Sequence, residues 1–297
     1  MPTDRRFLGP QLARLPATES ILPLVRLVRG PATAARLATR LIRGRVTVRD
    51  LPWRIEETCW NAFPSLKQVL LGDLLLRLSA GVSRRANSAN PLCTDPSAIA
   101  LAIASVEQLY RGHGLPAIFR VPSIIEPDLD RALAARGYTG EGESCVLHAP
   151  LAEVAAAADP EVQLLTSPSP EWFAAMSSLQ GHSAEQSATY RRIVGAIAIP
   201  ARFALLAVDG APAALAYGAL HEGLLCYESV ITDPARRRQR LAYRVIAALA
   251  DWAREAGAEG ACLQVEAGNV AGRALYDRFG LKTELYRYHY RREPPAR

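Results

Sequence analysis

The stretch that decides the fold is V-I-T-D-P-A-R-R-R-Q-R-L-A, from Val230 to Ala242. Its β-branched and apolar start, up to Thr232, predicts a buried strand, and the Asp-Pro pair that follows ends that strand because proline cannot donate to a neighbouring strand. Apolar residues then recur at helical spacing as far as Trp252, and Gly257 provides a C-cap. The predicted unit is a strand, a basic turn and a long helix.

The basic turn predicts anion binding. The first turn of a helix has backbone N–H groups without intrahelical partners and carries the positive end of the helix dipole, so it favours a phosphate. We expect this helix to begin near Arg237. The turn adds four guanidinium groups and one amide donor, from Arg236, Arg237, Arg238, Arg240 and Gln239. A solvated arginine patch at an ordinary strand–helix junction is an equally good interpretation of this segment alone.

A second motif follows the long helix. A strand-like run, Ala261 to Glu266, leads into N-V-A-G-R-A-L-Y-D-R-F-G-L, Asn269 to Leu281, and a further strand-like run covers Thr283 to Tyr290. In these segments the chain resembles the GNAT family, the GCN5-related N-acetyltransferases. The family's phosphate loop, Q/R-x-x-G-x-G/A, falls on Arg237, Arg240 and Ala242. Its next helix, N-x-x-A-x-x-L-Y-x-x-x-G-F, falls on Asn269, Gly272, Leu275, Tyr276, Gly280 and Leu281.

The phosphate loop departs from the family at Arg240, which stands where the family has glycine. Glycine lets the backbone approach a pyrophosphate closely. Either the arginine side chain points outward and the loop still works, or acetyl-CoA binding is weakened. The sequence leaves both alternatives open.

The resemblance implies an α/β (α+β) fold of two GNAT-like domains, each a mixed, mostly antiparallel sheet flanked by helices. The order helix, strand, helix, strand occurs at the end of both halves, which indicates an internal repeat. We predict a basic, partly helical arm over residues 1–45, a degenerate GNAT-like domain over 46–150 and a GNAT acetyltransferase domain over 161–292. The first copy lacks the arginine-rich loop, so we expect it to have lost acetyl-CoA binding.

Three local patterns make separate predictions. Residues 53–71 are predicted to be helical, with an interruption at Pro64. Residues 84–92 are predicted to form a strand that a proline closes. Asp209-Gly210 predicts a hairpin turn between strands 202–208 and 212–220, because both residue types tolerate the positive φ of such a turn.

Acetyl transfer from a thioester to an amine needs a neutral amine, a polarised carbonyl and a protonated leaving thiolate. The resemblance implies a cofactor role for the following residues: the backbone of Val230, Ile231 and Thr232 beside the pantetheine arm, the N–H groups of Arg237, Arg238, Gln239, Arg240, Leu241 and Ala242 around the pyrophosphate, and Asn269 against the cofactor arm. The acetyl donor would be acetyl-CoA as a co-substrate.

Tyr276 falls on the family's general-acid position, and a phenol with a pKa near 10 stays protonated at neutral pH. A tyrosine that only packs its helix onto the sheet is the alternative. Glu228, on the strand leading into the loop, is the candidate general base, and a solvent-facing glutamate or a water chain is the alternative. Weaker candidates are His182, His221 and Glu222 for the base, and Arg85, Asn87 and Asn90 for the acceptor, although the last three could serve turns or caps.

Charge and cysteine distribution limit the function classes. The first 50 residues hold ten arginines against three acidic residues, a net charge of +7, so the rest of this 297-residue chain sums to −1 out of a total of +6. The basic balance therefore belongs to the arm. The five cysteines and five histidines are widely scattered. We expect neither a disulfide framework nor a metal site.

The sequence therefore predicts a cytoplasmic, acetyl-CoA-dependent N-acetyltransferase that acts on an amine of a small molecule or peptide by direct transfer. The alternatives are a non-catalytic acyl-CoA-binding or regulatory module, and a nucleic-acid-associated protein that uses the basic arm; we expect no nucleic-acid partner. The arm also fits a transit peptide or a surface-lying helix. We expect no membrane span, and a homodimer is possible.

Overall fold

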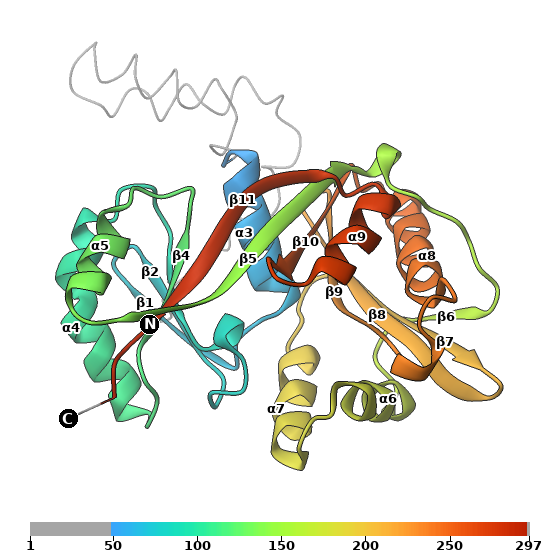
Figure 1. Ribbon diagram of the computed structural model, residues 1–297, viewed down its shortest axis with the longest axis horizontal. Helices are drawn as coiled ribbons and strands as arrows, with labels where there is room; N and C mark the ends of the chain where they lie inside the picture. The colour runs from blue at the N-terminus through green and yellow to red at the C-terminus, as the bar shows by residue number, and fades with distance from the viewer. Residues whose placement is uncertain (1–48, 296–297) are drawn as a thin grey trace, which may run out of the picture. The chain divides into compact units, whose positions relative to one another are not determined.

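The computed structural model describes residues 49–295 (Figure 1). From Asp50 onward the chain forms one compact unit, built on an 11-stranded sheet with the order β1-β2-β3-β4-β11-β5-β10-β9-β8-β7-β6. The predicted arm, residues 1–45, lies outside the described residues. None of the helices between residues 49 and 295 combines the length and apolar character that crossing a bilayer requires.

Both halves of the described chain contain helices and strands. The first half contains α3 (Leu51–Ala62), β1 (Lys67–Leu71), β2 (Leu74–Leu78), β3 (Ala89–Pro91), α4 (Ser97–Gly112), β4 (Ile118–Pro122), α5 (Asp128–Ala135) and β5 (Thr139–Pro150). The second half contains β6 (Val162–Leu165), α6 (Pro170–Gln180), α7 (Ala184–Gly195), β7 (Ala201–Val208), β8 (Ala211–His221), β9 (Leu224–Thr232), α8 (Leu241–Glu255), β10 (Gly260–Glu266), α9 (Val270–Phe279) and β11 (Thr283–Arg292).

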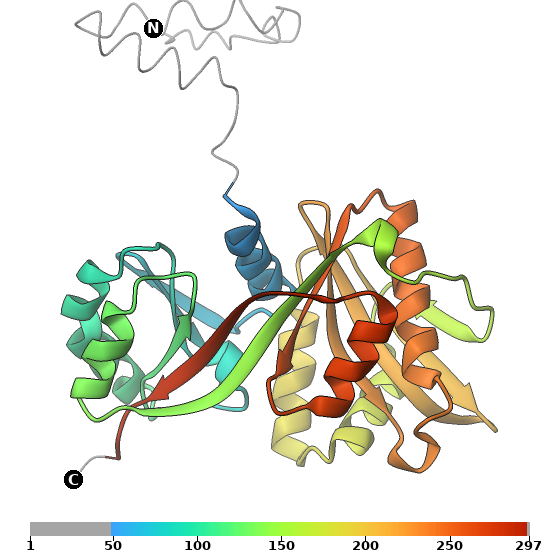
Figure 2. The ribbon, with the colours of Figure 1, turned by 45° about the horizontal axis from the view of Figure 1, so that its top comes forward.

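The centre of the sheet is an exchange of strands between the two halves of the chain. β5 and β11 pair with each other in antiparallel orientation, β5 also pairs with β10, and β11 also pairs with β4. The two long strands therefore run together across the middle of the compact unit (Figure 2). The repeated element order is α4-β4-α5-β5 in one half and α8-β10-α9-β11 in the other. The domain boundary between residues 150 and 161 stays a prediction.

Two local predictions were wrong and one was confirmed. Residues 67–71 form β1 and not a helix, because Gly72 adopts a φ of 55° in a two-residue turn that pairs β1 with β2. Only residues 89–91 of the predicted strand 84–92 are extended, since Asn87 accepts hydrogen bonds from two backbone N–H groups and holds the preceding segment in a loop. The hairpin at Asp209-Gly210 is confirmed, with positive φ at both residues.

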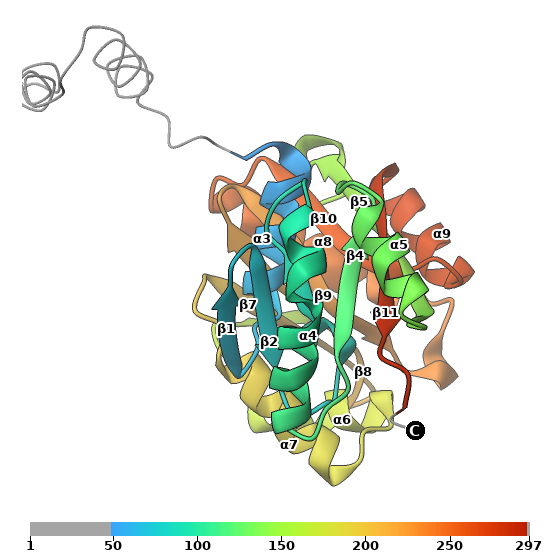
Figure 3. The same ribbon diagram turned by 90° about the vertical axis from the view of Figure 1, so that its left-hand side faces the viewer.

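Amphipathic helices cover the sheet and form its cores. α8 buries Leu241, Val245, Ile246 and Leu249, which recur at helical spacing, against strands of the second half. α4 lies over strands of the first half and buries its own apolar stripe there (Figure 3). The helices therefore pack on the faces of the sheet, and the strand ends near its middle are available to form a site.

Candidate active site

The site begins where two parallel strands separate. β9 and β10 pair only from Leu224 with Gly260 to Cys226 with Cys262. Beyond that point β9 carries a bulge, with Ser229 at a φ of 54°, and β10 continues along β5 as far as Glu266. The separated ends, residues 227–230 and 263–266, line opposite sides of a pocket of about 590 Å³.

Both halves of the chain contribute walls to this pocket. α9 supplies Asn269 and Tyr276 from the second half, and the segment 81–85 enters from the first half. β5 and β11 close the remaining side with Ser144, Tyr288, Tyr290 and Arg292. The strand exchange therefore builds a cavity from both halves, and the walls carry mostly polar side chains.

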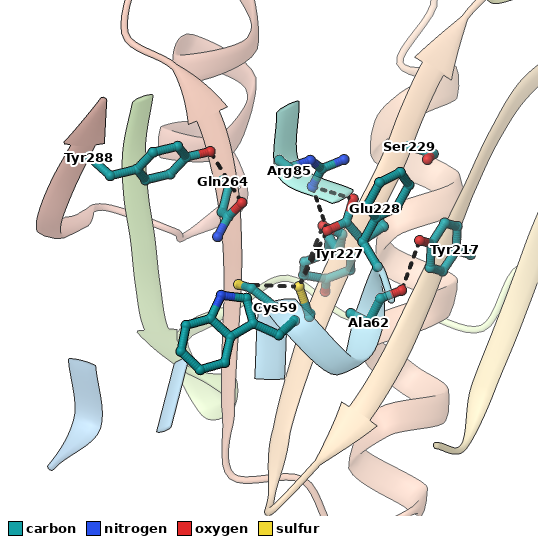
Figure 4. A network of polar contacts seen from close by, with 12 residues as sticks. Cys59, Ala62, Arg85, Tyr217, Tyr227, Glu228, Ser229, Gln264 and Tyr288 are labelled. Atoms are coloured by element: carbon teal, nitrogen blue, oxygen red, sulfur yellow. Dashed lines mark hydrogen bonds and ion pairs between the residues drawn. The ribbon is translucent and has the colours of Figure 1, made fainter. Parts of the chain in front are cut away.

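Glu228 is buried at this pocket and is not solvent-facing, with only 3% of its surface exposed. Both of its carboxylate oxygens accept hydrogen bonds from Nη1 of Arg85, at 2.7 and 2.8 Å (Figure 4). Burial raises the pKa of Glu228, and the positive charge of Arg85 opposes that shift. A proton-accepting group with a raised pKa is thus held in one orientation at the pocket wall.

Tyr276 lines the same pocket from α9 and is half-buried. Its hydroxyl group has no hydrogen-bond partner among the described residues, although its ring packs against the core that α8 covers. Burial, followed by the negative charge of Glu228, raises the pKa of Tyr276 to about 12. The phenol is therefore protonated at neutral pH and free to donate.

The basic turn lies at the end of β9, but helix α8 begins at Leu241 and not near Arg237. Arg238 and Arg240 adopt φ values of 66° and 60°, which a right-handed helix does not allow. The first backbone hydrogen bond across this start runs from Arg244 N to Arg240 O. Within the described part of the chain, the N–H groups of residues 237–243 donate to no protein acceptor. The predicted unpaired amides are present, with the helix start shifted.

The side chain of Arg240 lies against the ring of Tyr243. Its guanidinium carbon lies 5.0 Å from the ring centroid of Tyr243, and the residue is exposed. Arg236 pairs with Asp209, at 3.0 Å between Nη1 and Oδ2. Residues 237–240 are exposed, so the turn is accessible to solvent.

Comparison with known proteins agrees with this geometry. Residues 53–291 match a family model described as "Probable histone acetyltransferase Rv0428c C-terminal". The chain belongs to the GNAT family. An "Uncharacterized N-acetyltransferase YobR" of Bacillus subtilis is 26% identical over 242 residues, which cover 80% of this chain and 97% of that protein.

Solved structures share the fold. A GCN5-related N-acetyltransferase from Kribbella flavida is 19% identical with a TM-score of 0.63, over 84% of this chain and 98% of that one. A tandem GNAT protein from the clavulanic acid biosynthesis pathway is 15% identical with a TM-score of 0.53, over 66% of this chain and 70% of that one. At these identities the structures show the fold alone.

Asn269, the first residue of the second GNAT motif, caps α9. Its Oδ1 accepts a hydrogen bond from Gly272 N at 2.9 Å, and the residue also lines the pocket. A Cβ atom at position 272 would lie 2.7 Å from Asn269 Nδ2. Glycine at the place where GNAT proteins have alanine therefore leaves room for this cap.

Some predicted residues lie elsewhere. The weaker candidates that do not line the pocket are His182, His221, Glu222, Asn87 and Asn90. Of the predicted cofactor residues, Val230 and Asn269 line it, whereas Ile231, Thr232, Arg237, Arg238, Gln239, Arg240, Leu241 and Ala242 do not. His182 packs against Tyr190, and burial lowers its pKa. Asn87 and Asn90 hydrogen-bond to nearby backbone, which is the turn-forming role left open by the sequence. Of the three acceptor candidates, only Arg85 reaches the GNAT pocket.

Several wall residues carry no recognisable signal in the sequence. Arg84, Ser144, Gln264, Tyr288 and Tyr290 line the pocket and belong to four separate segments. Tyr288 donates a hydrogen bond to Gln264 Oε1 at 3.2 Å, which fixes both side chains (Figure 4). These residues meet only because β5 and β11 are exchanged, and no local pattern encodes that pairing.

Proposed function

We propose that this protein transfers an acetyl group from acetyl-CoA directly to the amine of a small molecule or peptide. The main support for the proposal is the opening between β9 and β10, which has Glu228 and Tyr276 on its walls. The unpaired backbone amides at the start of α8, the helix that follows β9, are the second support. A non-catalytic role would not require a proton acceptor and a proton donor at one opening.

The N–H groups of residues 237–242 would hold the diphosphate of acetyl-CoA, assisted by the arginines of the turn. The backbone of residues 230–232 would run beside the pantetheine arm, and Asn269 would contact that arm from the cap of α9. The unpaired amides of the turn and the pocket wall at Val230 and Asn269 support this proposed placement. Acetyl-CoA supplies an activated thioester carbonyl.

In the proposed reaction the neutral amine nitrogen bonds to the acetyl carbon and the carbon–sulfur bond breaks; three proton transfers balance this step, and the last returns the second nitrogen proton to the Tyr276 oxygen. Glu228 accepts a proton from the acceptor ammonium group, directly or through water, and its raised pKa suits it to that task. Arg85 orients the carboxylate and is a positioning residue. The Tyr276 hydroxyl donates a proton to the departing sulfur, and its pKa of about 12 keeps that proton available.

We also propose that the chain is a tandem GNAT protein, with a degenerate unit over residues 46–150 and the acetyltransferase unit over 161–292. The repeated order α4-β4-α5-β5 and α8-β10-α9-β11 supports this, as does the parallel pairing of β3 with β4 and of β9 with β10. The degenerate unit contributes the segment 81–85 to the pocket, so its remaining task would be to shape the acceptor site.

The rival function is a non-catalytic acyl-CoA-binding or regulatory module. Two observations favour it: Arg240 occupies a glycine position, and Glu228 is already engaged by Arg85. Release of CoA should be measured with acetyl-CoA and a panel of small amines, polyamines and lysine-containing basic peptides. Amine-dependent release supports transfer, whereas tight binding of acetyl-CoA without turnover on any amine supports the module.

The acceptor panel includes peptides because the matching family model is described as a probable histone acetyltransferase. Cytoplasmic location, a homodimer and the absence of a nucleic-acid partner stay predictions. Binding of acetyl-CoA in neither the wild type nor Arg240→Gly would count against the enzyme and the module alike.

A further inference from the structure

Three cysteines that are far apart in the sequence meet behind the pocket. Cys59 lies on α3, Cys226 on β9 and Cys262 on β10, and all three are buried. Their Sγ atoms lie within 4.8 Å of one another, and those of Cys59 and Cys226 are 3.8 Å apart. The sequence predicted scattered structural cysteines, and this cluster was missed because three strictly non-local contacts form it.

The cluster has the dimensions of a thiolate metal site. Zinc–sulfur bonds of about 2.3 Å in a tetrahedral site place two sulfurs roughly 3.8 Å apart. An oxygen donor is also near, since Glu228 Oε1 lies 4.0 Å from Cys226 Sγ. Cys59, Glu228 and Arg85 belong to one polar network (Figure 4). The three sulfurs alone lie within 4.8 Å of one another, and the Glu228 oxygen adjoins this set only beside Cys226. Three thiolates are a donor set that zinc-like cations accept.

The surrounding charge favours an anionic complex. Arg77, Arg85 and Arg120 bring three positive charges into this region, against the two carboxylates of Glu56 and Glu228. A divalent cation that replaces three thiol protons, M²⁺ + 3 RSH → M(SR)₃⁻ + 3 H⁺, adds one net negative charge and would neutralise that excess. Burying an unbalanced charge is costly, so the balance favours the metal-bound state.

We propose that Cys59, Cys226 and Cys262 bind a thiophilic divalent cation of the zinc and cadmium class. The bound cation lies beside Glu228, next to Cys226, and attracts the carboxylate that acetyl transfer would use. Metal binding therefore inhibits the enzyme, and this last consequence rests on the proposed function. The metal site itself does not depend on the proposed function.

The test is a cadmium titration of the reduced, full-length protein in weak buffer without CoA. We expect the ultraviolet thiolate-to-cadmium charge-transfer band to saturate at one ion per chain, with three protons released. Cys226→Ala and Cys262→Ala should lose the band. Cys145→Ala is the matched control, because Cys145 is a buried cysteine outside the cluster, and it should keep the band.

Thermal unfolding shows whether each variant is folded before metal is added. Cadmium should raise the melting temperature of the wild type and of Cys145→Ala, but not of Cys226→Ala. Zinc should then slow acetyl transfer by the wild type more than by Cys262→Ala. No band in the wild type, or an equal band in Cys226→Ala, would overturn the site. Binding without any acetyl transfer would leave the site standing and contradict only the proposed enzyme.

Discussion

The loops after β3 and β9 occupy the same place in the two halves but differ in chemistry. Each follows a strand with a parallel neighbour and leads into a helix, α4 or α8. After β9, the amides of residues 237–243 have no acceptor among the described residues, and the segment contains four arginines. After β3, the Asp95 carboxylate accepts a hydrogen bond from Ser97 N at 3.0 Å, and Leu92 N donates to Asp73 O.

This difference explains why we propose acetyl-CoA binding for only one of the two halves. The hydrogen bond from Ser97 lowers the pKa of Asp95, so a carboxylate stands at the start of α4. A fixed negative charge there repels a phosphate, whereas the start of α8 attracts one. The backbone topology permits a phosphate site at the start of both α4 and α8. The side chains favour phosphate binding only at the start of α8.

The largest effect is expected for Tyr276, the proposed proton donor in the half that we propose binds acetyl-CoA. Tyr276→Phe should lower kcat by about a hundredfold or more while CoA affinity stays almost unchanged, because a general acid contributes to the transition state and not to ground-state binding. Steady-state kinetics and calorimetric CoA binding give the two quantities. Tyr288→Phe is the matched control, since its phenol lines the same pocket but already bonds to Gln264. Equal losses in kcat and in affinity would mean that Tyr276 is structural.

The next largest expected effect is a shift in the pH dependence of kcat, which depends on Glu228 and its contact with Arg85 from the first half. Glu228 must be ionised to accept a proton, so activity is lost as the pH falls through its raised pKa. Arg85 lowers that pKa, and Arg85→Gln should therefore move the acidic limb of the kcat profile to higher pH by about 1 to 3 units.

Arg84→Gln is the control for that shift, because Arg84 lines the pocket without bonding to Glu228. Glu228→Gln should remove the limb. An unchanged limb in both Arg85→Gln and Glu228→Gln would exclude Glu228 as the base.

The contrast between the two loops predicts a smaller change in binding. Arg237→Ala should weaken CoA binding about fivefold, since a charge near an exposed helix start contributes up to about 1 kcal/mol. Asp95→Ala should leave one CoA per chain, because the other bonds of that loop remain. Calorimetry measures both. A second CoA in Asp95→Ala would show that the carboxylate alone closes the first half.

The smallest effect concerns backbone strain in the basic turn. Arg240→Gly and Arg238→Gly should each raise the free energy of unfolding by about 1 kcal/mol, because glycine adopts a positive φ without the steric cost. Urea unfolding measures the change. Arg237→Gly removes the same charge at a residue with a φ of −64°, and should give no gain. Destabilisation by Arg240→Gly would mean that its contact with Tyr243 outweighs the strain.

Local patterns predicted the parts of the site that lie on single elements. The periodicity of α8 and the hairpin at Asp209-Gly210 follow from residues close together in the chain. The start of α8 could not be predicted, because arginine at two left-handed positions contradicts its ordinary backbone preference.

Contacts between distant segments could not be predicted either. The exchange of β5 and β11 depends on strands more than a hundred residues apart, and it brings Arg85 to Glu228 and builds the walls of the pocket. The cysteine cluster has the same origin. A single sequence carries periodicity and turn chemistry, but it does not show which strand lies beside which.

A solved complex with CoA tests the central claim most directly. We predict the diphosphate against the backbone amides of residues 237–242 and the sulfur between β9 and β10, within hydrogen-bonding reach of the Tyr276 hydroxyl. A nucleotide bound instead at the start of α4, or in the second pocket lined by residues 121–130, 140–143 and 287–289, would contradict it.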